Sequence, residues 1–421
     1  MTLAIILFIL TYVFMFIFSD YKHIVCLISA LVFIVFKILP LNMVLSSIDY
    51  NVLLMILGIM GTVNLFIDSK MPNKLSDSII KISNNTKWMT ILLSFFSAVV
   101  SAFVDNVATV LMIAPVALSI AKKAKISPVP ILISISIFSN LEGAATLVGD
   151  TTSILLAEAV NMNFLDFFFY KNEIGLFFII QIGTIASLIL LYFKIRRNGR
   201  RVECENNTKV EDYFPTYLLI LTIVTLIIFS FIPNKISIAN GLICVTYYII
   251  GLVRDLIKDK DFSVLHNQLM MIDYQTLLLL ASLFIIIAGI KEAGVIDYIS
   301  NLFLGISNNV FVLYTCIVFF SVLISAFIDN IPYVATMLGV MSTLAVKLGV
   351  DATILYYGLI IGATLGGNLT PVGASANITS IGLLNKNGYK VSLKEYLSYS
   401  IPITLCAVIS GYLLVLLEFL S

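Results

Sequence analysis

The chain has 421 residues, of which 60% are hydrophobic and 12% are charged, and its formal net charge is +1. A soluble domain carries about 25% charged residues, so this composition indicates an integral membrane protein whose main surroundings are lipid. The balanced charge gives no sign of a nucleic-acid partner. The cysteines are far apart and only two histidines occur, which argues against a zinc site or another bound cofactor.

Apolar stretches of about 20 residues predict ten membrane spans, five in each half of the chain. The spans of the first half are Thr2–Phe18, His23–Leu39, Tyr50–Ile67, an interrupted span at Val129–Glu158, and Glu173–Phe193. The spans of the second half are Pro215–Ile232, Ile236–Val253, Tyr274–Ile290, an interrupted span at Thr353–Leu384, and Ser398–Leu420.

Two further apolar regions, 88–121 and 310–346, are each divided by an Asp-Asn pair. Their arms of roughly 14 to 17 residues are short for full spans, so they are predicted to be re-entrant hairpins that enter and leave on one side. Two short full spans would give the same topology, and arm length with the polar tip favours the hairpin.

The hairpin tips carry nearly the same six residues, SAFVDN at 101–106 and SAFIDN at 325–330. An Asp within an apolar span costs roughly 2.5–3.5 kcal/mol on insertion scales. Because this costly residue stands at matching places 224 positions apart, the pattern indicates two ion-handling elements of a transporter.

The repetition extends beyond the tips at the same offset. Ile48-Asp49-Tyr50 recurs as Ile272-Asp273-Tyr274, and residues 142–154 align with 366–378 without a gap. An odd number of spans in each half would invert the second half relative to the first. The sequence therefore predicts an all-α polytopic membrane protein of two inverted repeats, residues 1–193 and 215–421, joined by a cytoplasmic linker at 194–214.

Charge predicts the orientation of the chain. With residues 70–87 in the cytoplasm, twenty of the 25 Lys and Arg residues fall on the inner side, Lys22 among them. The positive-inside rule then places both termini outside. The expected location is a plasma (inner) membrane of the prokaryotic type.

Glycine, proline and polar residues interrupt two of the predicted spans, and backbone freed there must line a cavity or lie buried in protein. The hairpin tips and the interrupted spans together predict a binding site near the middle of the membrane. The predicted cation- or proton-binding residues are Asp105, Asn106, Gly149, Asp150, Asp329, Asn330 and Gly373. The predicted substrate-binding residues are Asn140, Thr146, Thr151, Thr152, Asn368, Thr370, Ser375 and Asn377. For the two tip aspartates, capping of the following helix is an alternative role that is compatible with ion binding.

The two half-sites differ in charge. Asp150 and Glu142 align with Ala374 and Gly366, so the first half-site has more titratable groups. The hypothesis is that Asp105 with Asp150 binds the coupling ion, with Na⁺ as a candidate ligand. Glu142 could alternatively lie solvated near the membrane surface.

At these motifs the sequence resembles the ion transporter superfamily, in the group of arsenite permeases, D-type sodium/proton antiporters and the melanosomal P protein. Ser101–Val116, Ser325–Met337 and Gly362–Ile378 carry the resemblance, whereas Gly143–Leu156 departs from the P-protein branch toward the antiporters. It implies a citrate-transporter-like domain and a homodimer with scaffold and transport domains that move as an elevator.

The expected function is ion-coupled secondary transport of a small inorganic ion or solute with Na⁺ or H⁺, and not catalysis. Related dicarboxylate carriers have Ser-Asn-Thr where this chain has Asp-Asn-Val and Asp-Asn-Ile. An acid in place of a neutral donor disfavours a carboxylate substrate unless a cation accompanies it. Citrate or dicarboxylate transport stays open as an alternative, with a channel and an intramembrane aspartyl protease as remote ones.

Overall fold

A computed structural model describes residues 1–83, 85–123, 126–196, 208–232, 236–259 and 262–419. Its first half is built from α1 (Thr2–Ile17), α2 (Lys22–Val35), α3 (Leu41–Ser47), α4 (Tyr50–Asp68), α5 (Met71–Ile82), α6 (Thr86–Ser101), α7 (Asn106–Lys123), α8 (Val129–Glu142), α9 (Thr151–Val160) and α10 (Leu176–Ile195). A small antiparallel hairpin, β1 (Phe169–Tyr170) and β2 (Glu173–Ile174), precedes α10.

The second half follows the same order. It is built from α11 (Phe214–Ser230), α12 (Ala239–Asp259), α13 (Phe262–Met270), α14 (Tyr274–Glu292), α15 (Val295–Ile306), α16 (Val310–Ser325), α17 (Asn330–Leu348), α18 (Thr353–Ile360), α19 (Ser375–Lys386) and α20 (Leu393–Glu418). A π-helical turn at Ile361–Leu365 and a 3₁₀ turn at Gly367–Leu369 separate α18 from α19.

Helices recur at the offset of 224 that the sequence motifs show. The bounds of α4, α5 and α6 coincide with those of α14, α15 and α16 after this shift, and α7, α8 and α9 begin where α17, α18 and α19 begin. The repeated Ile-Asp-Tyr motif is a helix start: Asp49 accepts a hydrogen bond from the Val52 amide at 3.1 Å, and Asp273 accepts one from the Thr276 amide at 3.0 Å. The inverted relation of the halves stays a prediction.

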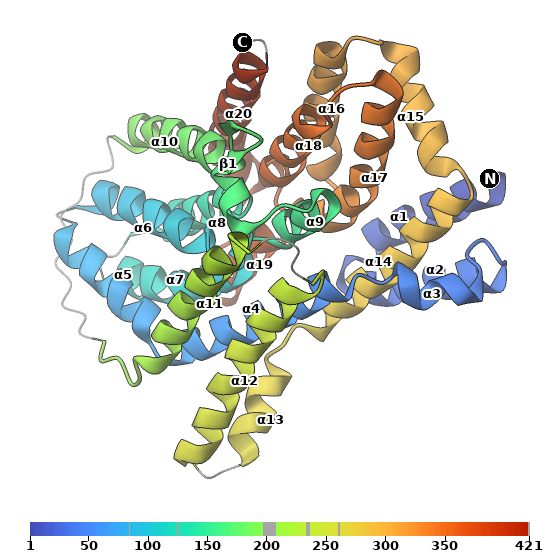
Figure 1. The fold of residues 1–421 in the computed structure, drawn as a ribbon. Coiled ribbons are helices and arrows are strands. Elements are labelled where there is room, and N and C mark those ends of the chain that lie inside the picture. The colour runs from blue at the N-terminus through green and yellow to red at the C-terminus, as the bar shows by residue number, and fades with distance from the viewer. Residues whose placement is uncertain (84, 124–125, 197–207, 233–235, 260–261, 420–421) are drawn as a thin grey trace.

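The helices form two groups, which Figure 1 shows in one view. In the first group α4 packs on α12 and α2 packs on α14. In the second group α8 packs on α6, α7 and α19, while α17 packs on α9 and α18. The short helices α9 and α19 therefore lie inside the second group against helices of the opposite half. Each follows a segment in which the α-helix is interrupted, residues 143–150 and 361–374, and these two segments are called the chain breaks below.

Six described helices are long and apolar enough to cross a membrane: α4, α10, α12, α14, α17 and α20. Shorter apolar helices account for most of the other predicted spans, so the total of ten stays a prediction. The 19 residues of α17 exceed the predicted arm length, because the helix continues to Gly349 with its left-handed φ of 66°. The pair α15 and α16 is bent by 115° at its junction.

Two predictions about elements need correction, and part of a third lies outside the described residues. The segment from Glu173 begins as strand β2, and the helix starts only at Leu176. Two short helices, α5 and α15, lie between the third predicted span of each half and the hairpin, where no helix was predicted. Their sequences mix polar and apolar residues, so a search for continuous apolar stretches passes over them. Of the predicted linker 194–214, residues 197–207 lie outside the described ones.

Candidate functional site

The tip of the first hairpin presents a carboxylate at the start of α7. Oδ1 of Asp105 accepts hydrogen bonds from the backbone amides of Val107 at 3.0 Å and Ala108 at 3.2 Å. Asp105 therefore caps the helix. Both of these hydrogen bonds go to Oδ1, and the side chain lines a cavity. Capping uses one oxygen and leaves the other for a ligand.

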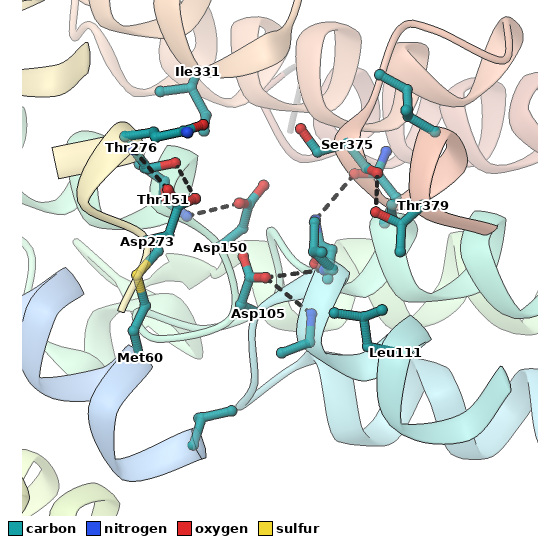
Figure 2. A pocket seen from close by; sticks show the side chains of 18 of the residues that line it. Met60, Asp105, Leu111, Asp150, Thr151, Asp273, Thr276, Ile331, Ser375 and Thr379 are labelled. Atoms are coloured by element: carbon teal, nitrogen blue, oxygen red, sulfur yellow. Dashed lines mark hydrogen bonds between the residues drawn. The ribbon is translucent and has the colours of Figure 1, made fainter. Parts of the chain in front are cut away.

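Asp150 occupies the same position at the start of α9. Its Oδ1 accepts a hydrogen bond from the Thr151 amide at 2.7 Å, and its Oδ2 accepts one from the Thr152 hydroxyl at 3.0 Å. The residue is 6% exposed and lines the same cavity as Asp105. Figure 2 shows the two carboxylates close together in this cavity.

No lysine or arginine among the described residues forms an ion pair with Asp105 or Asp150. Two carboxylates at a short distance repel each other unless a cation or a proton lies between them. The described ranges contain no cluster of three or more His, Cys, Asp or Glu residues around a metal position. A cation here would take its remaining ligands from hydroxyl, amide or backbone oxygens, which suits a monovalent ion or a proton.

A chain of buried amides and hydroxyls connects the first half-site to the second half of the molecule. The Asn106 amide donates to Oδ1 of Asn140 at 3.0 Å, and the Asn140 amide donates to the Thr364 carbonyl at 2.8 Å. The Thr364 hydroxyl in turn donates to Thr152 at 3.2 Å. Thr364 is the counterpart of Asn140 at the 224 offset, so the two broken spans contact each other through equivalent positions.

The second hairpin tip has a different electrostatic partner. Asp329 caps α17 through the Ile331 amide at 3.1 Å, and its Oδ2 accepts a hydrogen bond from the Ser375 hydroxyl at 3.4 Å. The same Oδ2 forms an ion pair with the ammonium group of Lys22, at the start of α2. The neighbouring Asn330 lines the cavity. The two half-sites therefore differ in charge even where their sequences match.

Gly149 and Gly373 bring each chain break against its hairpin tip. A Cβ at Gly149 would lie 2.6 Å from the Gly143 carbonyl oxygen and 2.9 Å from that of Ser101. A Cβ at Gly373 would lie 2.6 Å from the carbonyl oxygen of Ser325. The hydroxyls of Thr146 and Thr370 donate to the tip carbonyls of Ala102 and Ala326, respectively. These residues hold the backbone of the site in place.

The cavity has a volume of about 390 Å³ and brings together part of the predicted site. The predicted residues that line it are Asp105, Asn106, Asn140, Asp150, Thr151, Asn330 and Ser375. The predicted residues outside its lining are Thr146, Gly149, Thr152, Asp329, Asn368, Thr370, Gly373 and Asn377. Of these, Asn368 and Asn377 lie buried and hydrogen-bond each other at 3.3 Å, and the Asn368 amide also donates to the Ile137 carbonyl at 3.0 Å.

Several cavity residues were missed by the sequence analysis because they come from the first group of helices. Lys22 and His23 on α2, Asn64 on α4, and Asp273 and Thr276 at the start of α14 all line it. Asp273 belongs to the repeated Ile-Asp-Tyr motif, and this repetition was the available signal. Figure 2 shows Asp273 beside Asp150 and Asp105, so the cavity is lined by three carboxylates.

Glu142 lies away from solvent, so the alternative that it is solvated is wrong. The residue is 1% exposed at the end of α8, and its Oε2 accepts a hydrogen bond from the Gln181 amide of α10 at 2.6 Å. The helix α8 packs against α6, α10 and α20, which accounts for this burial.

Comparisons with known proteins give a consistent result. The sequence pattern of the CitMHS family, described as citrate transporter, matches residues 6–362 and 269–420. An uncharacterized transporter of Synechocystis is 26% identical over 84% of this chain and 83% of its own. A 46 kDa membrane protein of Mycobacterium leprae is 30% identical over 76% of this chain and 74% of its own.

Two further proteins extend the comparison. The human P protein is 25% identical over 89% of this chain, which spans 54% of that protein. The crystal structure of the YdaH transporter from Alcanivorax borkumensis superposes with a TM-score of 0.59 at 13% identity. The superposition covers 89% of this chain and 86% of that one, so the two share a fold.

Proposed function

Because the chain belongs to the CitMHS citrate transporter family and has the fold of a secondary transporter, we propose that it moves a small inorganic ion or solute with Na⁺ or H⁺. The type of transport we propose is that of the arsenite permeases and sodium/proton antiporters. The family and its relatives named as transporters support a role in transport rather than catalysis, in an integral membrane protein.

The observation that carries the proposal is the pair of carboxylates in one cavity, Asp105 and Asp150, which no described lysine or arginine pairs with. Each carboxylate is fixed by the helix start that it caps, so the negative charge is held at a defined place. A buried, uncompensated pair of this kind binds a proton or a cation, since leaving both groups ionised and bare is costly. This is the coupling-ion site in our proposal, with Na⁺ or H⁺ as its ligand.

The broken spans support a substrate position next to this site. Thr151, Ser375, Asn140 and Asn330 bring hydroxyl and amide groups from both halves to the cavity wall. Such groups bind a neutral or cationic solute without adding charge. We assign a positioning role to the predicted residues outside the lining. The tips are positioned by Thr146, Gly149, Thr370 and Gly373. Hydrogen bonds that stabilise the chain breaks come from Thr152, Asn368 and Asn377.

Citrate is a second candidate substrate, because the family is described as citrate transporter. No arginine is among the described residues that line the cavity, and Lys22 is already paired with Asp329. Three acids in the wall, Asp105, Asp150 and Asp273, would repel a bare tricarboxylate. A citrate that enters this cavity would therefore come with a bound cation that neutralises part of its charge.

For the mechanism we propose alternating access by elevator-like motion of two inverted repeats in a homodimer, in a plasma membrane of the prokaryotic type with both termini outside. The separation of the helices into two packed groups supports this proposal, because the cavity lies where the groups meet. Lys22, Asn64 and Asp273 come from one group, and Asp105 and Asp150 come from the other. Relative motion of the groups would change the walls of the cavity and the access to it.

The experiment uses purified protein in proteoliposomes that contain a pH-sensitive dye. The vesicles are challenged in turn with Na⁺, Li⁺, arsenite, citrate, and citrate with Mg²⁺. We expect a dye response to at least one cation or solute that Asp150→Asn abolishes and Asp351→Asn preserves, since Asp351 forms an exposed ion pair with Lys171 outside the cavity. Responses equal to those of protein-free vesicles in every arm, or a full response from Asp150→Asn, would contradict the proposal.

A further inference from the structure

The second half-site already contains a cation that belongs to the protein. Oδ2 of Asp329 is paired with the Lys22 ammonium, which reaches it from α2, 307 residues away in the chain. The lysine side chain is 26% exposed and the aspartate side chain is 17% exposed, so the pair is half-buried, and its lysine lines the cavity. A bound monovalent cation would occupy a comparable place beside Oδ2.

The first half-site has the opposite arrangement. Asp105 is the counterpart of Asp329 at the 224 offset, and a second acid, Asp150, stands where the other half has Ala374. With all groups ionised, Asp105 and Asp150 contribute two negative charges, whereas Asp329 and Lys22 cancel. Only the first half-site therefore needs a cation from solution.

Asp329 also retains the groups that a cation would use. The Ser375 hydroxyl lies 3.4 Å from Oδ2, and both Ser375 and Asn330 line the cavity. Lys22 and Asp273 line the same cavity, so an acid of the first helix group stands there as well. Removing the ammonium would leave oxygen ligands at a place that water from the cavity can reach.

We propose that Lys22 is a tethered cation that fills the second half-site, so that the protein binds an exchangeable cation only at Asp105 and Asp150. Loss of the charge at position 22 then opens a second cation site at Asp329. This inference rests on the proposed function, because it specifies how many ions the coupling site takes. It also explains how two nearly identical hairpin tips come to serve different purposes.

The contact between α2 and the second hairpin does not depend on this ion pair alone. The Tyr12 hydroxyl of α1 donates to the Pro332 carbonyl at 2.8 Å and lies 2.9 Å from the Thr336 hydroxyl. These bonds join the helix that precedes α2 to the first turns of α17. A variant without the lysine charge should therefore keep its fold, and its cation binding can be measured.

The test measures thermal unfolding in detergent as a function of Na⁺ concentration and, separately, of pH between about 6 and 8, where an ordinary lysine keeps its proton in both states. The slope of stability against the logarithm of ion activity counts the ions that the folded protein binds. We compare the wild type with Lys22→Met, Lys22→Arg, the charge-neutral double variant Lys22→Met/Asp329→Asn, and Lys171→Met. The last variant removes a lysine from an exposed ion pair with Asp351.

We expect Lys22→Met to bind one more ion, Na⁺ or H⁺, than the wild type, and the other three variants to match the wild type. An unchanged ion count in Lys22→Met, or the same extra ion in the double variant without Asp329, would overturn the inference. A wild type that binds no ion would count against the coupling site of the proposed function. One ion gained by Lys22→Met would still support the tethered cation in that case.

Discussion

Gly149 offers a direct test of how the first hairpin tip is positioned. In Gly149→Ala the new Cβ would lie 2.6, 2.9 and 3.0 Å from the carbonyl oxygens of Gly143, Ser101 and Ala102. These are backbone atoms that cannot rotate away, so the backbone at position 149 must separate by at least about 0.4 Å from the Gly143 oxygen to restore a 3.0 Å contact. The Ser101 and Ala102 oxygens of the tip leave no free room for this shift, so the tip must be displaced as well. Forced overpacking of this kind costs about 1–3 kcal/mol.

The separation should have two measurable effects. The thermal midpoint in detergent should fall by several degrees, because about 2–4 °C is lost per kcal/mol in a chain of 150–250 residues and somewhat less in a longer one. Ion binding should weaken as well, since Asp105 lies on the displaced tip and Asp150 directly follows the substituted glycine. Gly373→Ala should lower the midpoint by at least as much, because its nearest carbonyl oxygens would lie at 2.5, 2.6 and 2.8 Å.

The matched controls are Gly382→Ala in α19 and Gly305→Ala in α15. A Cβ at either position meets no atom within 4 Å. Both substitutions should leave the midpoint unchanged or raise it slightly, since alanine favours a helix over glycine by up to about 1 kcal/mol. If Gly149→Ala unfolds at the same temperature as these controls, the close approach of the tip to the chain break is not a feature of the protein in solution.

Three further predictions concern other parts of the molecule. Asn140→Ala should destabilise the protein by about 1–3 kcal/mol in a denaturation experiment, since it removes the amide between Asn106 and the Thr364 carbonyl; a change below about 0.5 kcal/mol would contradict the network. Asn161, which ends α9 with a φ of 56°, should tolerate glycine, whereas valine should cost about 1–2 kcal/mol in the same assay. Asp212 precedes α11, where burial raises the pKa of its carboxyl, but the hydrogen bonds from Arg254, the Phe214 amide and Lys258 together outweigh burial and lower that pKa to about 2. Its contribution, about 1 kcal/mol after solvent screening, should be complete above its unfolded value of 3.8 and disappear as the pH falls toward 2; Asp212→Asn should show no such loss in melts across this range.

The sequence was most informative where polar residues interrupt apolar ones. The tips at Asp105 and Asp329 and the chain breaks at Gly149 and Gly373 are visible because each is an exception in an oily context. Their identical spacing in both halves added the expectation that tip and break belong together. The structure brings them into contact through the hydroxyls of Thr146 and Thr370.

What the sequence did not predict depends on contacts between distant segments. Lys22 counted only as one of many basic residues on the inner side, because its partner lies 307 residues away. Asp273 was recognised as part of a repeat but not as a cavity residue, since its role depends on how α14 meets the hairpins. The amphipathic helices α5 and α15 were missed because their apolar residues cover one face only.

The central claim is that Asp105 and Asp150 hold one cation between them. The most direct test is a double-mutant cycle on the affinity for the coupling ion, with Asp105→Asn, Asp150→Asn and both together. We expect each single variant to lose at least about tenfold in affinity. The double variant should lose no more affinity than the single variant with the larger loss, because either change removes the same site. Affinity losses that simply add, or single variants that bind as the wild type does, would contradict the claim.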